Sequence, residues 1–263
     1  MFLTITYGII LITCIVSWIS FNSYSLKNKL ILSPSRVLHK KEIWLLFTHA
    51  FIHADFLHLF FNMYVLYMFG PYLEFYFTNH AAFGEFTFLI FYVCASMFAT
   101  IPSLYKHGNN PNYLSLGASG AVSAIVFSYI VLNPLKELGI ILLPGIWIPG
   151  FIFGILYILA ENYMSKKKYT NIAHDAHISG SIFGILFIMF FDFNNAKYFF
   201  ETLKQINFML FLCSLIMSLV MGFRQMQNYH LQSPNSNTNF QCFQRQLQKC
   251  KENRRGWCQN WVE

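Results

Sequence analysis

Long apolar runs alternate with short polar stretches along most of the chain. The first run covers residues 2–21, which is long enough to cross a bilayer as a helix. Five further apolar runs cover residues 56–77, 82–105, 116–132, 138–159 and 173–191. Because a bilayer offers no hydrogen-bond partners, each run must satisfy its own backbone groups. The pattern predicts an all-α, polytopic helical membrane protein with a six-helix core.

The two ends of the chain and the fifth run need separate interpretation. Residues 2–21 lack the basic start of a cleaved signal peptide, so we interpret them as a retained helix. The fifth run contains Pro144-Gly145 and Pro149-Gly150, which predict a kinked or broken helix. Residues 206–223 are a candidate seventh helix near the lower length limit for spanning. The predicted organisation is a membrane domain at 1–200, a candidate seventh membrane helix within 201–223, and a polar, disordered tail at 224–263.

The composition supports this membrane interpretation. Hydrophobic residues make up 56% of the 263 residues, and only 11% are charged, about half the share in a soluble domain. The mean hydropathy is +0.44. The net charge of +7 comes from basic residues in loops and in the tail, where anionic lipid headgroups are the simplest partner. We therefore predict a lipid bilayer as partner, and no nucleic acid.

Metal and cofactor chemistry has little support in the sequence. The chain has no HExxH motif, no CxxC pair and no Gly-Asp dipeptide, which argues against metallo- and aspartyl intramembrane proteases. His49, His53 and His58 do not share one helical face, and the pair His174 and His177 alone is a weak signal for a metal. We predict neither a metal nor a cofactor.

A serine and a histidine stand inside the apolar runs, each among small residues. Ser119 lies near the start of the fourth run, in Gly117-Ala118-Ser119-Gly120, and His177 lies near the start of the sixth. Polar groups in a bilayer either satisfy each other or carry function, and a histidine base can activate a serine nucleophile. Gly180 and Gly184, four residues apart, let a neighbouring helix approach closely. Such packing would bring Ser119 and His177 within hydrogen-bond reach, although ordinary small-residue packing explains the glycines equally well.

A second polar pair, His58 and Asn62, is four residues apart and therefore shares a helical face. Their N–H groups, with the backbone N–H of Ser119, are suitable donors to a developing oxyanion. A polar helix end wetted by headgroup water is the alternative interpretation. Asp175 is excluded as a third catalytic residue, because it is two residues from His177 and points about 200° away from it on a helix.

Most of the chain, apart from the first helix and the tail, resembles the rhomboid family of intramembrane serine proteases. The resemblance runs from Trp44 to Gly184 and rests on motifs that follow one another in the family's order. These are Thr48-His49-Ala50-Phe51-Ile52-His53, His58-Leu59-Phe60-Phe61-Asn62, Gly70-Pro71-Tyr72-Leu73-Glu74, Gly117-Ala118-Ser119-Gly120 and Ala176-His177-Ile178-Ser179-Gly180 with Gly184. It implies that Ser119 is the nucleophile, that His177 is its base in a dyad without a carboxylate, and that His58 and Asn62 bind the oxyanion.

The resemblance also implies roles for residues around the dyad. Gly117 and Gly120 match glycines that let backbones approach the nucleophile, and Gly180 and Gly184 match a close helix contact. His53 and Glu74 match structural positions. Phe61 lies on the second helix, which with the fifth helix resembles a lateral gate, and a lipid-facing ring is the alternative for it. Two residues depart from the family pattern: Leu45 follows Trp44 in place of arginine, and Ser123 stands where some members have an aromatic residue.

The predicted function is that of an intramembrane serine endopeptidase that cleaves transmembrane segments of other membrane proteins. The alternatives are an inactive rhomboid-like protein that binds membrane clients, and an unrelated polar-lined carrier or channel. The resemblance implies a bacterial cell membrane with the active site toward the extracytoplasmic side. The basic run Lys166-Lys167-Lys168 would then lie outside, against the preference of basic loops for the cytoplasm.

Overall fold

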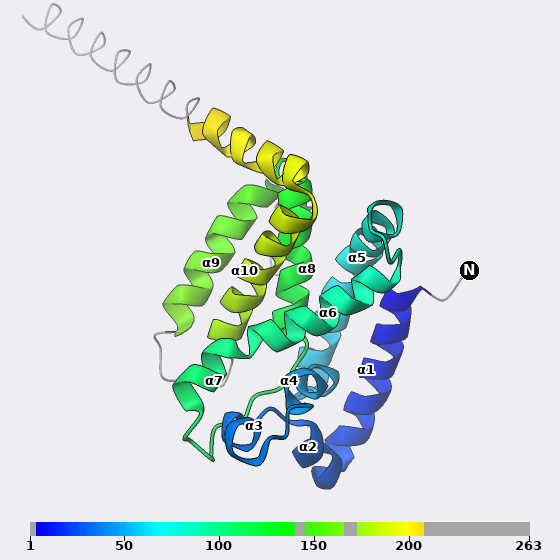
Figure 1. The fold of residues 1–263 in the computed structure, drawn as a ribbon, viewed down its shortest axis with the longest axis vertical. Coiled ribbons are helices and arrows are strands. Elements are labelled where there is room, and N and C mark those ends of the chain that lie inside the picture. The colour runs from blue at the N-terminus through cyan, green and yellow to red at the C-terminus, as the bar shows by residue number, and fades with distance from the viewer. Residues whose placement is uncertain (1–3, 140–144, 146, 166–172, 208–263) are drawn as a thin grey trace, which may run out of the picture. The chain divides into compact units, whose positions relative to one another are not determined.

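The computed structural model describes residues 4–139, 145, 147–165 and 173–207 (Figure 1). The chain divides into two units, Met1–Thr202 and Leu203–Glu263, and the fold below is that of the first. Four helical stretches in the described residues are long and apolar enough to cross a membrane: α1 (Ile5–Asn22), α5 (Phe56–His80), α6 with α7 (Phe86–His107) and α10 (His174–Phe191). Two apolar helices are shorter, α8 (Ser119–Leu132) and α9 (Gly150–Ser165). The prediction of an all-α, polytopic membrane protein is confirmed.

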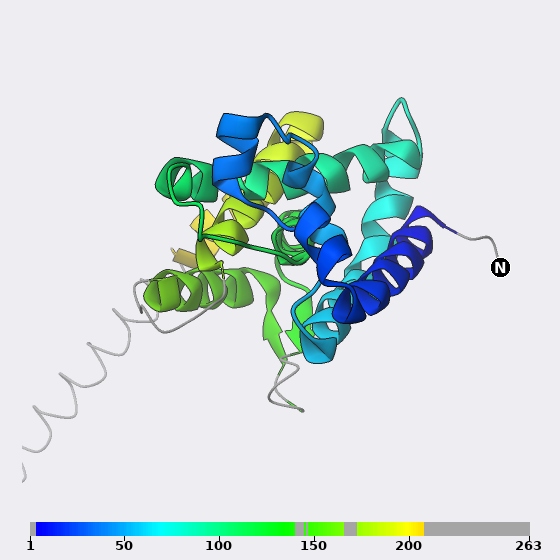
Figure 2. The ribbon, with the colours of Figure 1, turned by 90° about the horizontal axis from the view of Figure 1, so that it is seen from below.

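The core of the unit forms around α8. Helices α5, α6, α9 and α10 all pack against it, and Figure 2 shows α8 nearly end-on among its neighbours. Most of its residues are buried, including every residue from Gly120 to Ser128. A short apolar helix rich in Gly, Ala and Ser suits this position, because small side chains let several helices approach one backbone. The first residue of this buried helix is Ser119.

The packing of α10 on α8 has almost no side chains between the two backbones. A Cβ atom built on Gly180 would lie 2.0 Å from the carbonyl oxygen of Gly120, and one built on Gly184 would lie 2.2 Å from that of Ala124. These two contacts are one helical turn apart on both helices, so they set the register between them. Ser128 adds a hydrogen bond from its Oγ to the Gly184 carbonyl at 3.1 Å.

Helix α1 is held against α5 by a buried carboxylate. Glu74 on α5 accepts hydrogen bonds from the backbone N–H groups of Ile5 and Thr6, at 2.8 and 2.9 Å, and from Thr6 Oγ1 at 2.6 Å. The first N–H groups of a helix have no partner within it, and their partial positive charge favours an anion. Gly70, one turn earlier, leaves room for Thr6, since a Cβ there would lie 2.7 Å from Thr6 Cγ2. Glu74 therefore acts as the missing N-terminal cap of α1.

The polar connection between the first two long helices contains short helices of its own. These are α2 (Tyr24–Leu30), α3 (Pro34–Lys40), α4 (Leu45–Thr48) and the 3-10 turn η1 (His49–Phe51). Leu45, which departs from the family pattern, is fully buried and packs in one cluster with Leu32 and Val37. Arg36 pairs with Glu42 within the same connection. An apolar contact therefore fills the position where arginine was expected.

Two predicted helices differ from the structure. The fifth was placed at 138–159, but strands β1 (Glu137–Gly139) and β2 (Trp147–Pro149) form an antiparallel pair there, and α9 begins only at Gly150. Proline supplies no N–H and disfavours a helical residue before it, so Pro149 ends the extended segment. The third, placed at 82–105, starts at Phe86 and is interrupted at Thr100 between α6 (Phe86–Ala99) and α7 (Ile101–His107). The described residues end at 207, so the candidate seventh helix at 206–223, apart from its first two residues, and the tail at 224–263 lie outside them.

Candidate active site

Ser119 and His177 lie next to each other at the ends of two packed helices. Ser119 is the first residue of α8, and His177 is in the first turn of α10. His177 Nε2 lies 2.7 Å from Ser119 Oγ, which is hydrogen-bond distance. Further along the same pair of helices, Gly180 and Gly184 of α10 contact the backbone of α8. These contacts hold the Ser119 and His177 side chains at this separation. This distance and pairing are what a serine nucleophile and a histidine base would require.

The backbone before Ser119 requires glycine at position 117. Gly117 has a φ of +116°, a region that other residues rarely adopt. Its N–H donates to the carbonyl of His49 at 2.9 Å, and a Cβ atom on it would lie 2.7 Å from Cε1 of the His58 ring. Gly120 is similarly confined, since a Cβ there would lie 2.4 Å from that of Ala99. Both glycines therefore allow the close approaches that place Ser119.

His53 connects this backbone to the first long helix. Its Nε2 accepts the N–H of Ala118 at 3.3 Å, and its Nδ1 lies 3.0 Å from Ser17 Oγ. Ser17 donates its own hydroxyl proton to the carbonyl of Phe51 at 3.1 Å, so Nδ1–H of His53 must be the donor to Ser17. Burial, with the neighbouring His58 as a smaller cause, lowers the pKa of His53 to about 3. His53 is thus a neutral structural histidine with one defined tautomer.

His58 and Asn62 lie on α5, beside Ser119 and the backbone before it. The rings of His53 and His58 meet edge to face at 4.9 Å between centroids. Asn62 is buried, and its Nδ2 donates to the carbonyl of His58 at 2.8 Å, which leaves its second N–H for another acceptor. Ser119, at the start of its helix, adds a backbone N–H without an intrahelical partner. These three donors form a candidate oxyanion site.

A cavity of about 190 Å³ adjoins Ser119 between α5, α8 and α9. Most of its lining is apolar: Phe61, Asn62, Val65, Ser119, Val122, Ser123, Val126, Phe127, Phe153 and Tyr157. Phe61 thus faces the cavity together with residues of α9, and its side chain is also partly exposed. Ser123, where the family pattern suggested an aromatic residue, lies 2.8 Å from the hydroxyl of Tyr157. The cavity is large enough for an apolar side chain beside Ser119.

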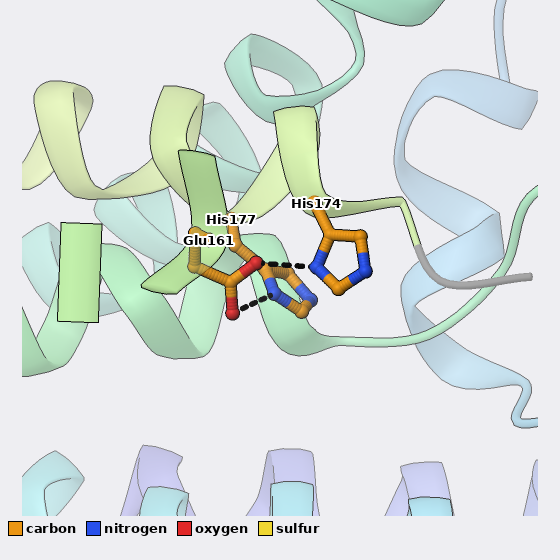
Figure 3. A group of neighbouring side chains, drawn as sticks. All are labelled: Glu161, His174 and His177. Carbon is orange, nitrogen blue, oxygen red and sulfur yellow. Dashed lines mark hydrogen bonds and ion pairs between the residues drawn. The ribbon is translucent and has the colours of Figure 1, made fainter. Parts of the chain in front are cut away.

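A carboxylate that no sequence motif indicated, that of Glu161, lies against the rings of His174 and His177 (Figure 3). Glu161 Oε1 is 3.0 Å from His177 Nδ1, and Glu161 Oε2 is 2.6 Å from His174 Nδ1. The first contact has ion-pair distance, while the direction of its N–H falls short of good hydrogen-bond geometry. Glu161 is the only charged residue of α9, and a lone ionisable group in an apolar span is a signal of function. That signal was available in the sequence.

Glu161, His174 and His177 also have the composition of a metal site. Their ligand-type atoms lie within 4.8 Å of one another, and two histidines with a glutamate can bind zinc. In this structure one carboxylate spans both rings, so the three groups already satisfy each other. The predicted absence of a metal or cofactor stays a prediction. Asp175, excluded above as a third catalytic residue, pairs instead with Lys106 Nζ at 2.6 Å.

Comparison with known proteins identifies the family. Residues 40–192 match the family model of the Rhomboid domain, which is more than half of the chain. The matched region contains Ser119, His177, His58, Asn62 and Glu161. A comparison with individual curated proteins finds no match. The chain is therefore an integral membrane protein of the rhomboid family, a family that contains intramembrane proteases and inactive members.

Proposed function

We propose that this chain is an intramembrane serine endopeptidase that cleaves transmembrane segments of other membrane proteins. The observation that carries the proposal is the 2.7 Å contact between His177 Nε2 and Ser119 Oγ. It occurs beside an apolar cavity and a set of hydrogen-bond donors, which are the remaining parts that acyl transfer needs. An inactive family member has no need for a nucleophile and a base at this distance.

The reaction proceeds in two steps at these atoms. His177 Nε2 takes the proton of Ser119 while Oγ bonds to the substrate carbonyl carbon, and the carbonyl oxygen becomes an oxyanion. The peptide C–N bond then breaks as His177 returns that proton to the leaving nitrogen. Water attacks the acyl group in the second step with His177 again as base, which frees the carboxylic acid and restores Ser119. Asn62, His58 and the Ser119 N–H stabilise both oxyanions.

The substrate must expose its backbone to reach these atoms. In a transmembrane helix each peptide carbonyl is hydrogen-bonded and covered by side chains. A segment therefore has to unwind locally beside Ser119 before its carbonyl can be attacked. The cavity favours substrates with an apolar side chain near the cleaved bond, because its lining is mostly apolar and a polar side chain buried there would find few hydrogen-bond partners. Transmembrane proteins within the same bilayer are the proposed partners.

The proposal is tested with purified protein in liposomes and a panel of transmembrane substrates. We expect cleavage within a transmembrane segment, and covalent labelling of Ser119 by a fluorophosphonate that reacts with activated serines. Mass spectrometry of the labelled peptide identifies the serine. Absence of both cleavage and label, with transmembrane segments still bound, would instead support the client-binding alternative.

We also propose that the protein lies in a bacterial membrane with its active site on the extracytoplasmic side. The test is the accessibility of the cysteine in a Lys106→Cys variant to a thiol reagent in whole cells. Reaction only with reagent on the cytoplasmic side of the membrane would contradict this orientation.

Loss of both oxyanion side chains should slow the chemical step. Removing one oxyanion donor typically lowers kcat by about 10²–10³-fold, and we expect His58→Ala with Asn62→Ala to lose at least that much. The measurement is kcat and KM in liposomes. Asn79→Ala is the matched control, because Asn79 on the same helix donates to the carbonyl four residues earlier as Asn62 does, at 2.7 Å. A double variant with the kcat of the parent protein would contradict the role.

Shortening Phe61 should ease access for membrane substrates. Phe61 lines the cavity opposite Phe153 and Tyr157 of α9, so its ring lies where a segment entering between α5 and α9 would pass. We expect Phe61→Ala to cleave a transmembrane substrate several-fold faster and a short soluble peptide at an unchanged rate. Phe75→Ala is the control, since that ring is exposed on the same helix and does not line the cavity. Equal changes for both substrates would rule out a gate.

A further inference from the structure

The carboxylate of Glu161 connects two histidines, one of which is the proposed catalytic base. One oxygen lies 3.0 Å from His177 Nδ1 and the other lies 2.6 Å from His174 Nδ1. On its opposite side the His177 ring meets Ser119 through Nε2 at 2.7 Å. Carboxylate, imidazole and hydroxyl therefore form a continuous series across α9, α10 and α8, in which both nitrogens of His177 face a polar group.

Glu161 is a charged side chain in buried surroundings. Its side chain is only 9% exposed, that of His174 is 2% exposed, and that of His177 is 13% exposed. A buried carboxylate costs several kcal/mol unless its lone pairs are satisfied, and apolar replacements are often as stable. An apolar helix such as α9 therefore gains little stability from a glutamate at this position. A contribution to the chemistry of His177 is one reason to keep the charge, and a structural tie between α9 and α10 is the other.

The contact decides which nitrogen of His177 carries the proton. A carboxylate accepts hydrogen bonds and cannot donate them, so its position 3.0 Å from Nδ1 favours the tautomer with the proton on Nδ1. Nε2 then presents its lone pair to the hydroxyl of Ser119, which is the tautomer a general base requires. When the proton of Ser119 moves to Nε2, the ring becomes positive and the carboxylate stabilises it. In soluble serine proteases an aspartate likewise holds the catalytic histidine in the correct tautomer and stabilises its charged form.

His174 in turn fixes the carboxylate. Its 2.6 Å contact is short, as expected for a charge-assisted hydrogen bond, and it holds the second oxygen so that the first stays on His177. His174 and His177 are three residues apart in the first turn of α10 and so face the same neighbour. The present angle at His177 Nδ1 is poor, and catalytic hydrogen bonds often tighten only when substrate binds.

We propose that Glu161 is a positioning residue for His177, held in place by His174, so that this chain extends the Ser-His dyad with a carboxylate. The inference rests on the proposed function. A purely structural role, in which Glu161 only ties α9 to α10, makes different predictions. That tie would affect stability and activity in parallel, and it would leave the tautomer of His177 unchanged.

The experiment compares two variants of the full chain in liposomes. Glu161→Gln keeps the shape and removes the charge, whereas Glu161→Leu removes both and suits an apolar helix. We expect kcat to fall at least about 10-fold in Glu161→Gln and further in Glu161→Leu, toward the roughly 10⁴-fold loss of soluble triads, with KM unchanged. Asp175→Asn is the matched control, because it breaks another ion pair between helices, that with Lys106, and should keep its kcat.

The second measurement does not depend on activity. In ¹⁵N NMR of labelled histidine, His177 of the parent protein should show a protonated Nδ1 and an unprotonated Nε2, and Glu161→Leu should show a mixture of tautomers. An unchanged tautomer in Glu161→Leu, or an unchanged kcat in both variants, overturns the positioning role. Loss of activity in the parent protein on adding EDTA, restored by Zn²⁺, overturns it in favour of a metal. If the parent protein neither cleaves nor labels, the proposed function fails, and the NMR comparison still tests the contact.

Discussion

Ser119→Ala is expected to abolish cleavage of transmembrane substrates while the protein stays folded. The reacting oxygen is lost, and removal of the nucleophile or base of a soluble serine protease lowers kcat on the order of 10⁶-fold. Alanine is the best helix former, and within the described residues the Ser119 side chain hydrogen-bonds only to His177, so the first turn of α8 should persist. His177→Ala should lose a similar factor, and the double variant no more, because the two residues act as one unit. The measurements are kcat in liposomes and the thermal midpoint in detergent.

A second serine on the same helix provides the control. Ser128 is buried in α8, and its Oγ donates to the carbonyl of Gly184 at 3.1 Å. Ser128→Ala therefore removes one buried hydrogen bond on the same pair of helices, which costs about 1 kcal/mol of stability, and should leave kcat near that of the parent protein. If Ser119→Ala or His177→Ala turned over substrate like the parent protein, the catalytic assignment would be wrong.

The helices could be predicted because a bilayer constrains each apolar run separately. Five of the six predicted runs correspond to helices with shifted ends, and α8, only 14 residues long, is recognisable by its small residues. The predicted fifth helix was wrong over residues 138–139 and 147–149, where β1 and β2 pair instead. Apolar periodicity does not distinguish a short strand from a helix when the run is uniformly apolar. The prolines at 144 and 149 indicated a break, but not the pairing of strands on either side of it.

The contact between Ser119 and His177 could be anticipated, because the glycines of α8 and α10 allow the two helix backbones to approach closely. The position of Glu161 beside His177 could not be predicted, because this contact depends on how α9 packs against α10. Helix periodicity does not determine that packing. The tautomer of His53 is set by Ser17 on α1, a residue that no local pattern connects to the active site. The contacts of Glu161 and Ser17 depend on tertiary structure. The small residues at which α8 and α10 meet follow from their spacing in the sequence.

Gly184→Val is expected to lower both stability and activity, because α10 has no room for any side chain at this point. A Cβ atom on Gly184 would lie 2.2 Å from the carbonyl oxygen of Ala124 and 2.9 Å from its carbon. Both are backbone atoms, so no flexible side chain can move aside, and the helices must separate. Overpacking of a core typically costs about 1–3 kcal/mol, and the fixed backbone places this variant at the upper end or beyond.

The effect on activity follows from the same contact between α8 and α10. Ser119 and His177 are carried by α8 and α10, and a misplacement of about 1 Å can lower a rate by about 10²-fold. We expect Gly184→Ala to lose less than Gly184→Val, with the thermal midpoint and kcat falling in that order. Gly8→Val is the matched control, because Gly8 is also inside a long helix and a Cβ there meets no atom within 4 Å. A Gly184→Val protein that melts and cleaves like the parent would show that the two backbones are not in contact, and the distance that brings His177 to Ser119 would then need another cause.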